Sequence, residues 1–231
     1  MAIDIHYRFI SGEGSENNFA VSLDPVTLDL FPTDDKKLPE WAKLGFHQCK
    51  HCSLTPASHP FCPAAVAIVP LAKAFEGFCS HDELDVEVTT IERKTIQHTS
   101  AQRAIGSLMG LVLAVSGCPH TLFFKPMARF HLPFASEEET IFRALSVYLL
   151  GQYFINRADG GADFELNGLE AIYHNAQKVN HAMATRLRAV SETDSSVNAV
   201  VFLDMYAKAM PFVLKNNLEE IAYLFPKNHP A

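Results

Sequence analysis

Hydrophobic and polar residues alternate along several short segments in the first half of the chain. Residues 5–10 and 19–23 form two such segments, and a period of two is typical of strands with one buried face. The turn-rich segment 11–18 between them predicts a hairpin with a long loop. Residues 84–88 alternate in the same way, and the polar segment 92–99 could return beside them. We therefore expect four antiparallel strands in one sheet.

The second half of the chain carries the signals of helices. Thr99-Ser100-Ala101-Gln102 and Ser136-Glu137-Glu138-Glu139 both match a capping box, in which a hydroxyl and a side chain three residues later satisfy backbone groups at a helix start. Helices are expected to begin at both places. The helical segments that the pattern predicts elsewhere are 64–78, kinked or restarted at Pro70, 137–156, 167–190, and 196–225 with a break near Pro211.

These elements predict an α+β fold, in which a small antiparallel sheet from the N-terminal half packs with a mainly helical C-terminal half. Residues 1–99 would hold the sheet and a cysteine- and histidine-rich loop, and residues 100–231 would form a helical bundle. Of the 231 residues, 48% are hydrophobic and 19% are charged. This composition allows a substantial core, either in one domain or in two small ones.

The stretch 104–124 contains no charged residue and is the only candidate for a membrane span. Gly117 suits a helix C-terminus and Pro119 cannot continue a helix, so a helix of about 16 residues from Ser100 is expected. A bilayer span needs about 20 apolar residues. The stretch therefore predicts a buried central helix, and no membrane partner is expected.

Charge and cysteine content indicate which partners and which cell compartment to expect for the protein. With 26 acidic and 19 basic side chains the net charge is -7, so a general attraction to nucleic acid is not expected. Residues 1–6 contain no basic segment followed by an apolar one, as a secretory signal would. We therefore expect a cytoplasmic, reducing location, where the five cysteines would be thiols or metal ligands rather than a closed disulfide set.

Cysteines with the spacing of metal ligands are the sharpest chemical feature. They occur in His47-Gln48-Cys49-Lys50-His51-Cys52 and in His59-Pro60-Phe61-Cys62-Pro63. Cys49 and Cys52 can point at one ion, because the two residues between them form a tight turn. Cys62 follows ten residues later, and Cys118 is the natural fourth ligand. A bound metal would also tie down the long irregular stretch 31–63.

Local sequence favours Cys62 and Cys118 as ligands. Cys62 precedes Pro63, a favoured first helical residue, so its sulfur would lie at a helix N-terminus where the dipole favours a thiolate. Cys118 lies at the exit of the apolar helix, where irregular backbone can aim a side chain. Cys79 is expected to be the odd thiol. The alternative is that all these cysteines are buried, inert thiols.

The sequence leaves the choice of metal open between Zn2+ and a [4Fe-4S] cluster, because both suit four thiolates. Abundant histidines favour zinc, whereas the Cys-Pro pairs at Cys62 and Cys118 are typical of ferredoxin-type runs. His51 could be a ligand or could face solvent. The histidines that could be additional ligands, or donors of hydrogen bonds to thiolates, are His47, His59 and His120.

A second candidate site lies between Lys125 and Ser136. Arg129 and His131 precede the helix start at Ser136, and a cation, an imidazole and a helix N-terminus could together bind a small anion. The alternative is a structural connector in which Arg129 forms a salt bridge to a nearby carboxylate.

No phosphate-binding glycine loop, dinucleotide fingerprint, nucleophile elbow or His-Glu-x-x-His run occurs in the sequence. The chain instead resembles a family of uncharacterised bacterial proteins, a domain of unknown function. The motifs that carry the resemblance are His47-x-Cys49-x-x-Cys52-x-Leu54, His59-x-x-Cys62-Pro63, Ser116-Gly117-Cys118-Pro119-His120 and Ala128-Arg129-Phe130-His131-Leu132-Pro133-Phe134. The resemblance spans most of the chain, implies a bacterial, cytosolic protein, and supplies no activity.

Three kinds of function fit these features. The first is a metal-binding protein in which the four-cysteine site has a structural or sensing role. The second is a metal-dependent or iron-sulfur enzyme that acts on a small anionic molecule through His120, Arg129 and His131. The third is a metal-free interaction module in which the cysteines are merely buried.

Overall fold

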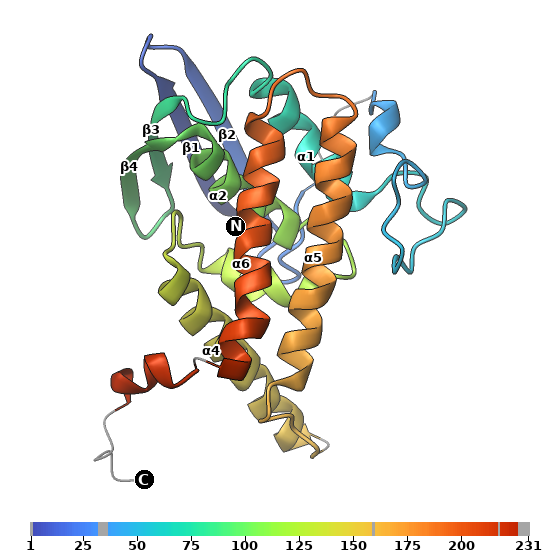
Figure 1. The fold of residues 1–231 in the computed structure, drawn as a ribbon, viewed down its shortest axis with the longest axis vertical. Coiled ribbons are helices and arrows are strands. Elements are labelled where there is room, and N and C mark those ends of the chain that lie inside the picture. The colour runs from blue at the N-terminus through green and yellow to red at the C-terminus, as the bar shows by residue number, and fades with distance from the viewer. Residues whose placement is uncertain (1, 32–36, 159, 217, 226–231) are drawn as a thin grey trace.

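A four-stranded antiparallel sheet forms one side of the molecule (Figure 1). The computed structural model describes residues 2–31, 37–158, 160–216 and 218–225. The strands are β1 (Ile3–Ser11), β2 (Glu16–Leu23), β3 (Glu83–Thr89) and β4 (Lys94–Ser100), in the order β2-β1-β3-β4. Both predicted strand pairs are confirmed, and pairing of β1 with β3 joins them into the single expected sheet.

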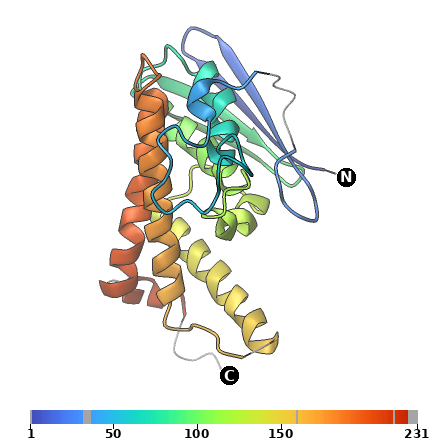
Figure 2. The same cartoon turned by 90° about the vertical axis from the view of Figure 1, so that its right-hand side faces the viewer.

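Helices make up most of the rest of the described chain, which confirms the α+β class. They are α1 (Pro63–Ala74), α2 (Ala101–Ala114), α3 (Lys125–Arg129), α4 (Glu137–Ala158), α5 (Asn167–Arg188) and α6 (Ser195–Asn216), with short 3-10 helices η1 (Glu40–Ala42), η2 (Leu122–Phe124) and η3 (Leu218–Leu224). Figures 1 and 2 both show α5 and α6 side by side, with α4 leading away from the sheet.

Alternation along the strands places one face of the sheet in the core. Ile5, Tyr7 and Phe9 of β1 are each 1% exposed, while their strand neighbours lie on the outer face. The ring of Phe9 packs edge-on against Phe75, which follows α1, at a centroid distance of 4.8 Å. The sheet, α1, α2 and parts of α5 and α6 share this core, and a smaller apolar cluster joins α4 to α5 and α6.

Two glycines let α6 lie close against α2. A Cβ atom at Gly106 would lie 3.4 Å from the carbonyl oxygen of Ala199, and one at Gly110 would lie 3.2 Å from Cδ2 of Leu203. Both contacts are tight, so larger side chains at these positions would push the helices apart. The absence of Cβ atoms therefore sets the α2–α6 spacing.

The predicted break near Pro211 is wrong, because α6 runs continuously from Ser195 to Asn216. A proline in a helix removes the N–H that would bond the carbonyl four residues earlier, here that of Ala207. The side-chain amide of Gln177 on α5 donates a 2.8 Å hydrogen bond to this carbonyl instead. Tertiary contact thus replaces the missing backbone donor.

The helix near Pro70 also differs from its prediction. α1 is continuous across Pro70 and ends at Ala74. Of the two alternatives, a kink or a restart at Pro70, the restart is wrong, and so is the extension to residue 78. Gly77 has a φ of +101°, a left-handed conformation that ends the helical path. α2 has 14 residues and is followed by Gly117 at φ +84°, as the sequence predicted for its end.

One of the two predicted capping boxes is confirmed. The backbone N–H of Ser136 donates to Glu139 Oε2 at 2.7 Å, and the N–H of Glu139 donates to Ser136 Oγ at 3.2 Å. The box predicted at Thr99 is wrong: β4 runs directly into α2, and Ser100 makes no side-chain cap bond. The first amides of α2 donate instead to the carbonyl oxygens of Asp82 and Ser80.

One helix in the described part of the chain, Ser195–Lys215 within α6, is long and apolar enough to cross a membrane by length and composition. A core helix passes the same test, and α6 packs against α2 and α5. The stretch 104–124, which the sequence singled out, contains most of α2, which is largely buried as expected, and the short helix η2.

Candidate metal centre

An irregular loop carries three of the cysteines between η1 and α1. We call residues 43–62 the cysteine loop. Its two ends are held together, because Leu44 N–H donates to the Pro60 carbonyl at 3.0 Å and Cys62 N–H donates to the Ala42 carbonyl at 2.8 Å. Figures 1 and 2 both show the loop alongside α5. Residues 32–36 of the longer irregular stretch lie outside the described residues.

Cys49 and Cys52 lie at the two ends of a tight turn in this loop. The N–H of Cys52 donates to the carbonyl oxygen of Cys49 at 3.0 Å, and both side chains are half-buried. The turn expected from the two-residue spacing is therefore present. It can hold both sulfurs on one side of the loop.

Cys62 lies at the start of one helix and Cys118 lies just after the end of another. Cys62 is the N-cap of α1, with Pro63 as the first helical residue, and Cys118 lies in the turn after α2. A Cβ atom at Gly117 would lie 4.0 Å from Cβ of Pro63, so this turn lies against the start of α1. Both cysteines are 7% exposed.

The four thiols are close enough to affect one another's ionisation. Burial, followed by the charges of Cys62, Cys118 and Cys52, raises the pKa of Cys49 to about 12. Burial is also the main cause that raises the pKa of Cys118 to about 11, and Cys62 and Cys52 add to it. Without a metal, Cys49 and Cys118 would therefore be protonated at neutral pH. A metal would have to displace these protons.

The sulfurs are gathered but not arranged as ligands. Among the residues that the structure describes, no group of three or more His, Cys, Asp or Glu side chains is placed to hold a metal ion. Metal binding would therefore have to rearrange the cysteine side chains. Cys79, the expected odd thiol, is exposed and lies between α1 and β3.

Arg186 on α5 is a buried cation beside this cluster, and the sequence reasoning missed it. It is 1% exposed. Its Nη1 donates to the carbonyl oxygens of Trp41 and Lys43, the latter at 2.8 Å, and its Nη2 donates to that of Leu44 at 3.0 Å. The guanidinium therefore fastens α5 to the start of the cysteine loop.

The charge of Arg186 has no carboxylate partner among the described residues. Burial lowers its pKa, while the thiols of Cys62, Cys49 and Cys52 act in the opposite direction. Its Nε is buried and lacks a hydrogen-bond partner in the described chain. The available signal was its position: Val179, Met183 and Arg186 fall on one helical face, where an arginine interrupts an apolar stripe.

The histidines near the cysteines divide into two pairs. His47 and His59 are exposed, and their rings contact Phe46 and Ser58 rather than the thiols. The His120 ring lies against that of His51, with centroids 3.9 Å apart and planes tilted by 34°, and its Nε2 lies 3.0 Å from the carbonyl oxygen of His51. This pair fastens the turn after α2 to the cysteine loop.

His51 does not face solvent, as one reading of the sequence had it. Both ring nitrogens are buried without a well-formed hydrogen bond in the described part of the chain. Burial and then His120 lower its pKa, so the ring is neutral.

A protein-family model matches residues 5–226, almost the full length of the chain, and it describes DUF6901, a domain of unknown function. The chain belongs to the DUF6901 family. No curated protein and no solved structure is significantly similar to it. Family membership thus confirms the resemblance noted from the sequence, and the chemistry of this DUF6901 chain must be argued from its own residues.

The anion-binding site expected between Lys125 and Ser136 of this DUF6901 chain is not formed as one group, because its side chains have separate partners. Arg129 lies 3.5 Å from Glu92 as an ion pair, which is the connector arrangement considered from the sequence. Lys125 bonds to Asp29 at 2.6 Å. His131 instead points inward, where its Nε2 hydrogen-bonds with the Tyr7 hydroxyl. Burial, and then the charge of Arg143, lower the pKa of His131 to about 3.

Proposed function

We propose that Cys49, Cys52, Cys62 and Cys118 bind one metal centre, either Zn2+ or a [4Fe-4S] cluster, which clamps the cysteine loop to the turn after α2. The observation that carries the proposal is the burial of the Arg186 guanidinium beside these cysteines with no carboxylate near it in the described chain. A buried charge is costly unless an opposite charge compensates it.

A metal held by four thiolates supplies that compensation. Four thiolates outweigh the charge of Zn2+, and they likewise leave an oxidised [4Fe-4S] centre with a net negative charge. Arg186 would then neutralise part of the charge of the centre, as donors around a metal commonly do. In the metal-free protein Cys49 and Cys118 are protonated, and the Arg186 guanidinium contacts backbone carbonyl oxygens and the Phe46 ring rather than a negative charge.

The surroundings favour a structural role over a catalytic one. Cys62 and Cys118 are buried, and structural metal sites use all four positions for protein ligands. The side chains that a catalytic reading required are engaged elsewhere: His120 with His51, Arg129 with Glu92, and His131 with Tyr7. The proposal is therefore a metal-dependent clamp, whose loss would release the loop.

A zinc ion and an iron-sulfur cluster require different spacings of the four cysteine sulfurs. Zinc needs sulfurs about 3.8 Å apart, as follows from a tetrahedron with Zn–S bonds of about 2.3 Å. A cluster spreads its four thiolates around a larger cube. The two centres would therefore hold the four sulfurs at different spacings. Visible absorption and metal content distinguish the two.

The test is to purify the full chain without oxygen and to measure zinc, iron, sulfide and visible absorption. About one zinc per chain, or about four irons with broad visible absorption, supports the proposal. Cys62→Ser and Cys118→Ser should each lose most of the metal. Cys79→Ser is the matched control, because Cys79 is exposed and outside the cluster. A metal-free protein that takes up neither zinc nor iron with sulfide would overturn the proposal.

A further inference from the structure

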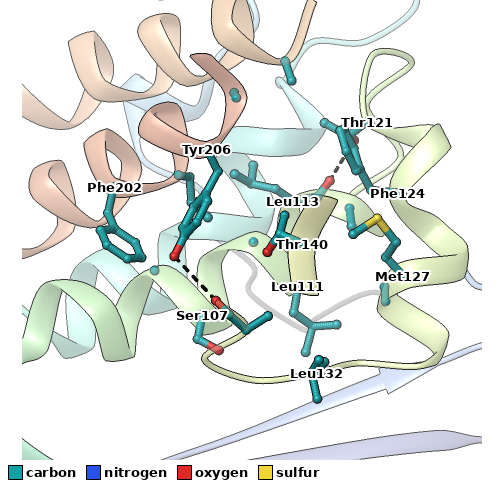
Figure 3. Close-up of a pocket in the computed structure, with 18 of the residues that line it drawn as sticks. Ser107, Leu111, Leu113, Thr121, Phe124, Met127, Leu132, Thr140, Phe202 and Tyr206 are labelled. Carbon is teal, nitrogen blue, oxygen red and sulfur yellow. Dashed lines mark hydrogen bonds between the residues drawn. The ribbon is translucent and has the colours of Figure 1, made fainter. Parts of the chain in front are cut away.

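A cavity of about 210 Å3 lies between α2, α3, α4, α5 and α6 (Figure 3). We call it the inter-helical pocket. None of the four clustered cysteines lines it. Its walls are mainly apolar, and the larger apolar side chains include Leu111, Phe124, Met127, Leu132, Phe202 and Leu203. The pocket is thus separate from the candidate metal centre.

Two buried polar side chains face this apolar space without protein partners. Asn180 and Tyr173 on α5 are 8% and 4% exposed, and both line the pocket. Neither the Asn180 amide nor the Tyr173 hydroxyl makes a hydrogen bond within the described chain. By contrast, Figure 3 shows the Thr121 hydroxyl bonded to the Leu113 carbonyl in the same wall. The buried polar side-chain atoms without a partner in the described chain belong to His51, Arg186 and Asp204. The polar atoms of Asn180 and Tyr173 therefore reach the open space of the pocket, where a ligand can pair them.

Arg143 on α4 adds a cation to the same wall. Its Nη2 donates to the carbonyl oxygens of Met127 and Phe130 at 2.7 and 3.0 Å, which fixes the side chain. Its Nε and Nη1 have no partner in the described residues. Glu139 interacts with this cation, but its Oε2 accepts the Ser136 N–H, and no carboxylate lies within ion-pair distance of Arg143 among the described residues.

We propose that the inter-helical pocket binds a small apolar monocarboxylate, with its chain among the helices and its carboxylate on Arg143. The two unused N–H groups of the guanidinium match the two oxygens of a carboxylate. Asn180 and Tyr173 donate the remaining hydrogen bonds. Arg103 also lines the pocket but is exposed, so Arg143 is the one cation fixed in the wall. One fixed positive charge suits a monoanion better than a phosphate dianion.

The volume sets the size of the ligand. A cavity of about 150 Å3 holds benzene, which has six heavy atoms. By the same proportion the pocket holds about eight heavy atoms, which matches the eight carbons of a medium-chain fatty acid whose carboxylate oxygens reach the half-buried Arg143. Octanoate is therefore the probe. 1-Octanol keeps the chain without the charge, and acetate keeps the charge without the chain.

The experiment is calorimetric titration of the full-length protein with each of the three probes. Octanoate should bind, 1-octanol should bind at least tenfold more weakly, and acetate should not bind measurably. Arg143→Gln should weaken octanoate binding at least tenfold and leave 1-octanol binding unchanged. Arg157→Gln is the control, because Arg157 is on the same helix but contacts Tyr153 outside the pocket.

A second variant keeps the test decisive if Arg143→Gln folds poorly. Asn180→Leu should weaken octanoate binding several-fold and should not weaken 1-octanol binding, since it removes an amide donor from the pocket wall and adds apolar surface. Absence of octanoate binding to the wild-type chain would overturn the proposal. Equal octanoate binding to the wild type and to folded Arg143→Gln, or 1-octanol binding as tight as octanoate binding, would also overturn it.

Discussion

The Arg186 guanidinium donates a 3.0 Å hydrogen bond to the carbonyl oxygen of Leu44, a residue 142 positions earlier in the chain. This bond joins helix α5 to a loop that has little regular structure of its own. It also places a cation beside the cysteine cluster. Arg186 therefore connects the stability of the cysteine loop with the charge at the cysteine cluster.

Arg186→Leu should lower the free energy of unfolding by about 2–4 kcal/mol, because it leaves buried carbonyl oxygens unpaired. Urea unfolding monitored by circular dichroism measures this change. Arg188→Leu, two residues later and exposed, is the matched control and should change stability by less than about 0.5 kcal/mol. Equal effects of the two substitutions would show that Arg186 does not fasten the loop.

Arg186→Leu should also weaken metal binding, because it removes the positive charge that offsets the thiolates. We expect at least tenfold faster loss of metal to a chelator than in the wild type. Arg186→Lys keeps the charge but not the planar guanidinium, so its rate of metal loss should lie between those of the wild type and Arg186→Leu. If Arg186→Leu retains metal as well as the wild type does, compensation of charge is not the role of Arg186.

Metal removal should expose the cysteine loop more than the helices. The loop has few backbone hydrogen bonds, whereas the helices have their own caps and apolar faces. Hydrogen exchange followed by mass spectrometry, with and without a chelator, should show lost protection over residues 46–62 and little change in α5 and α6. Equal protection of the loop in both states would contradict a metal clamp.

Stability should fall with acidity because of His131. Its folded pKa of about 3 lies below the ordinary value of 6.5, so the unfolded chain binds the proton more readily between these values. The contribution of the neutral ring is present above pH 6.5 and is lost as the pH falls toward 3, by up to about 1.4 kcal/mol per pH unit. The glutamine in His131→Gln does not titrate, so the free energy of unfolding of this variant should fall less steeply as the pH is lowered. Parallel pH profiles of the two proteins would exclude His131 as the cause.

The serines that directly precede α4 and α2, Ser136 and Ser100, should respond differently to alanine. Ser136→Ala removes a reciprocal cap and should cost about 1 kcal/mol of stability. Ser100→Ala should cost much less, because Ser100 makes no side-chain cap bond. Thermal unfolding of the two variants measures the difference, and a larger effect at Ser100 would show that the cap assignment is reversed.

The sequence by itself determined the elements whose signals are local. Strands β1 and β3 bury every second residue, so their apolar alternation was sufficient to predict them. The box at Ser136 and the turn at Gly117 likewise depend only on neighbouring residues. The CxxC turn from Cys49 to Cys52 is local in the same sense.

Tertiary structure decided everything that depends on a distant partner. α6 continues through Pro211 because Gln177 on another helix supplies the missing donor to Ala207. α2 begins without its own cap because carbonyls before β3 accept its first amides. Arg186 becomes part of the cysteine cluster because α5 packs over the loop. A hydrogen bond or charge contact between distant segments leaves no periodic trace in the sequence, so only the packed chain reveals it.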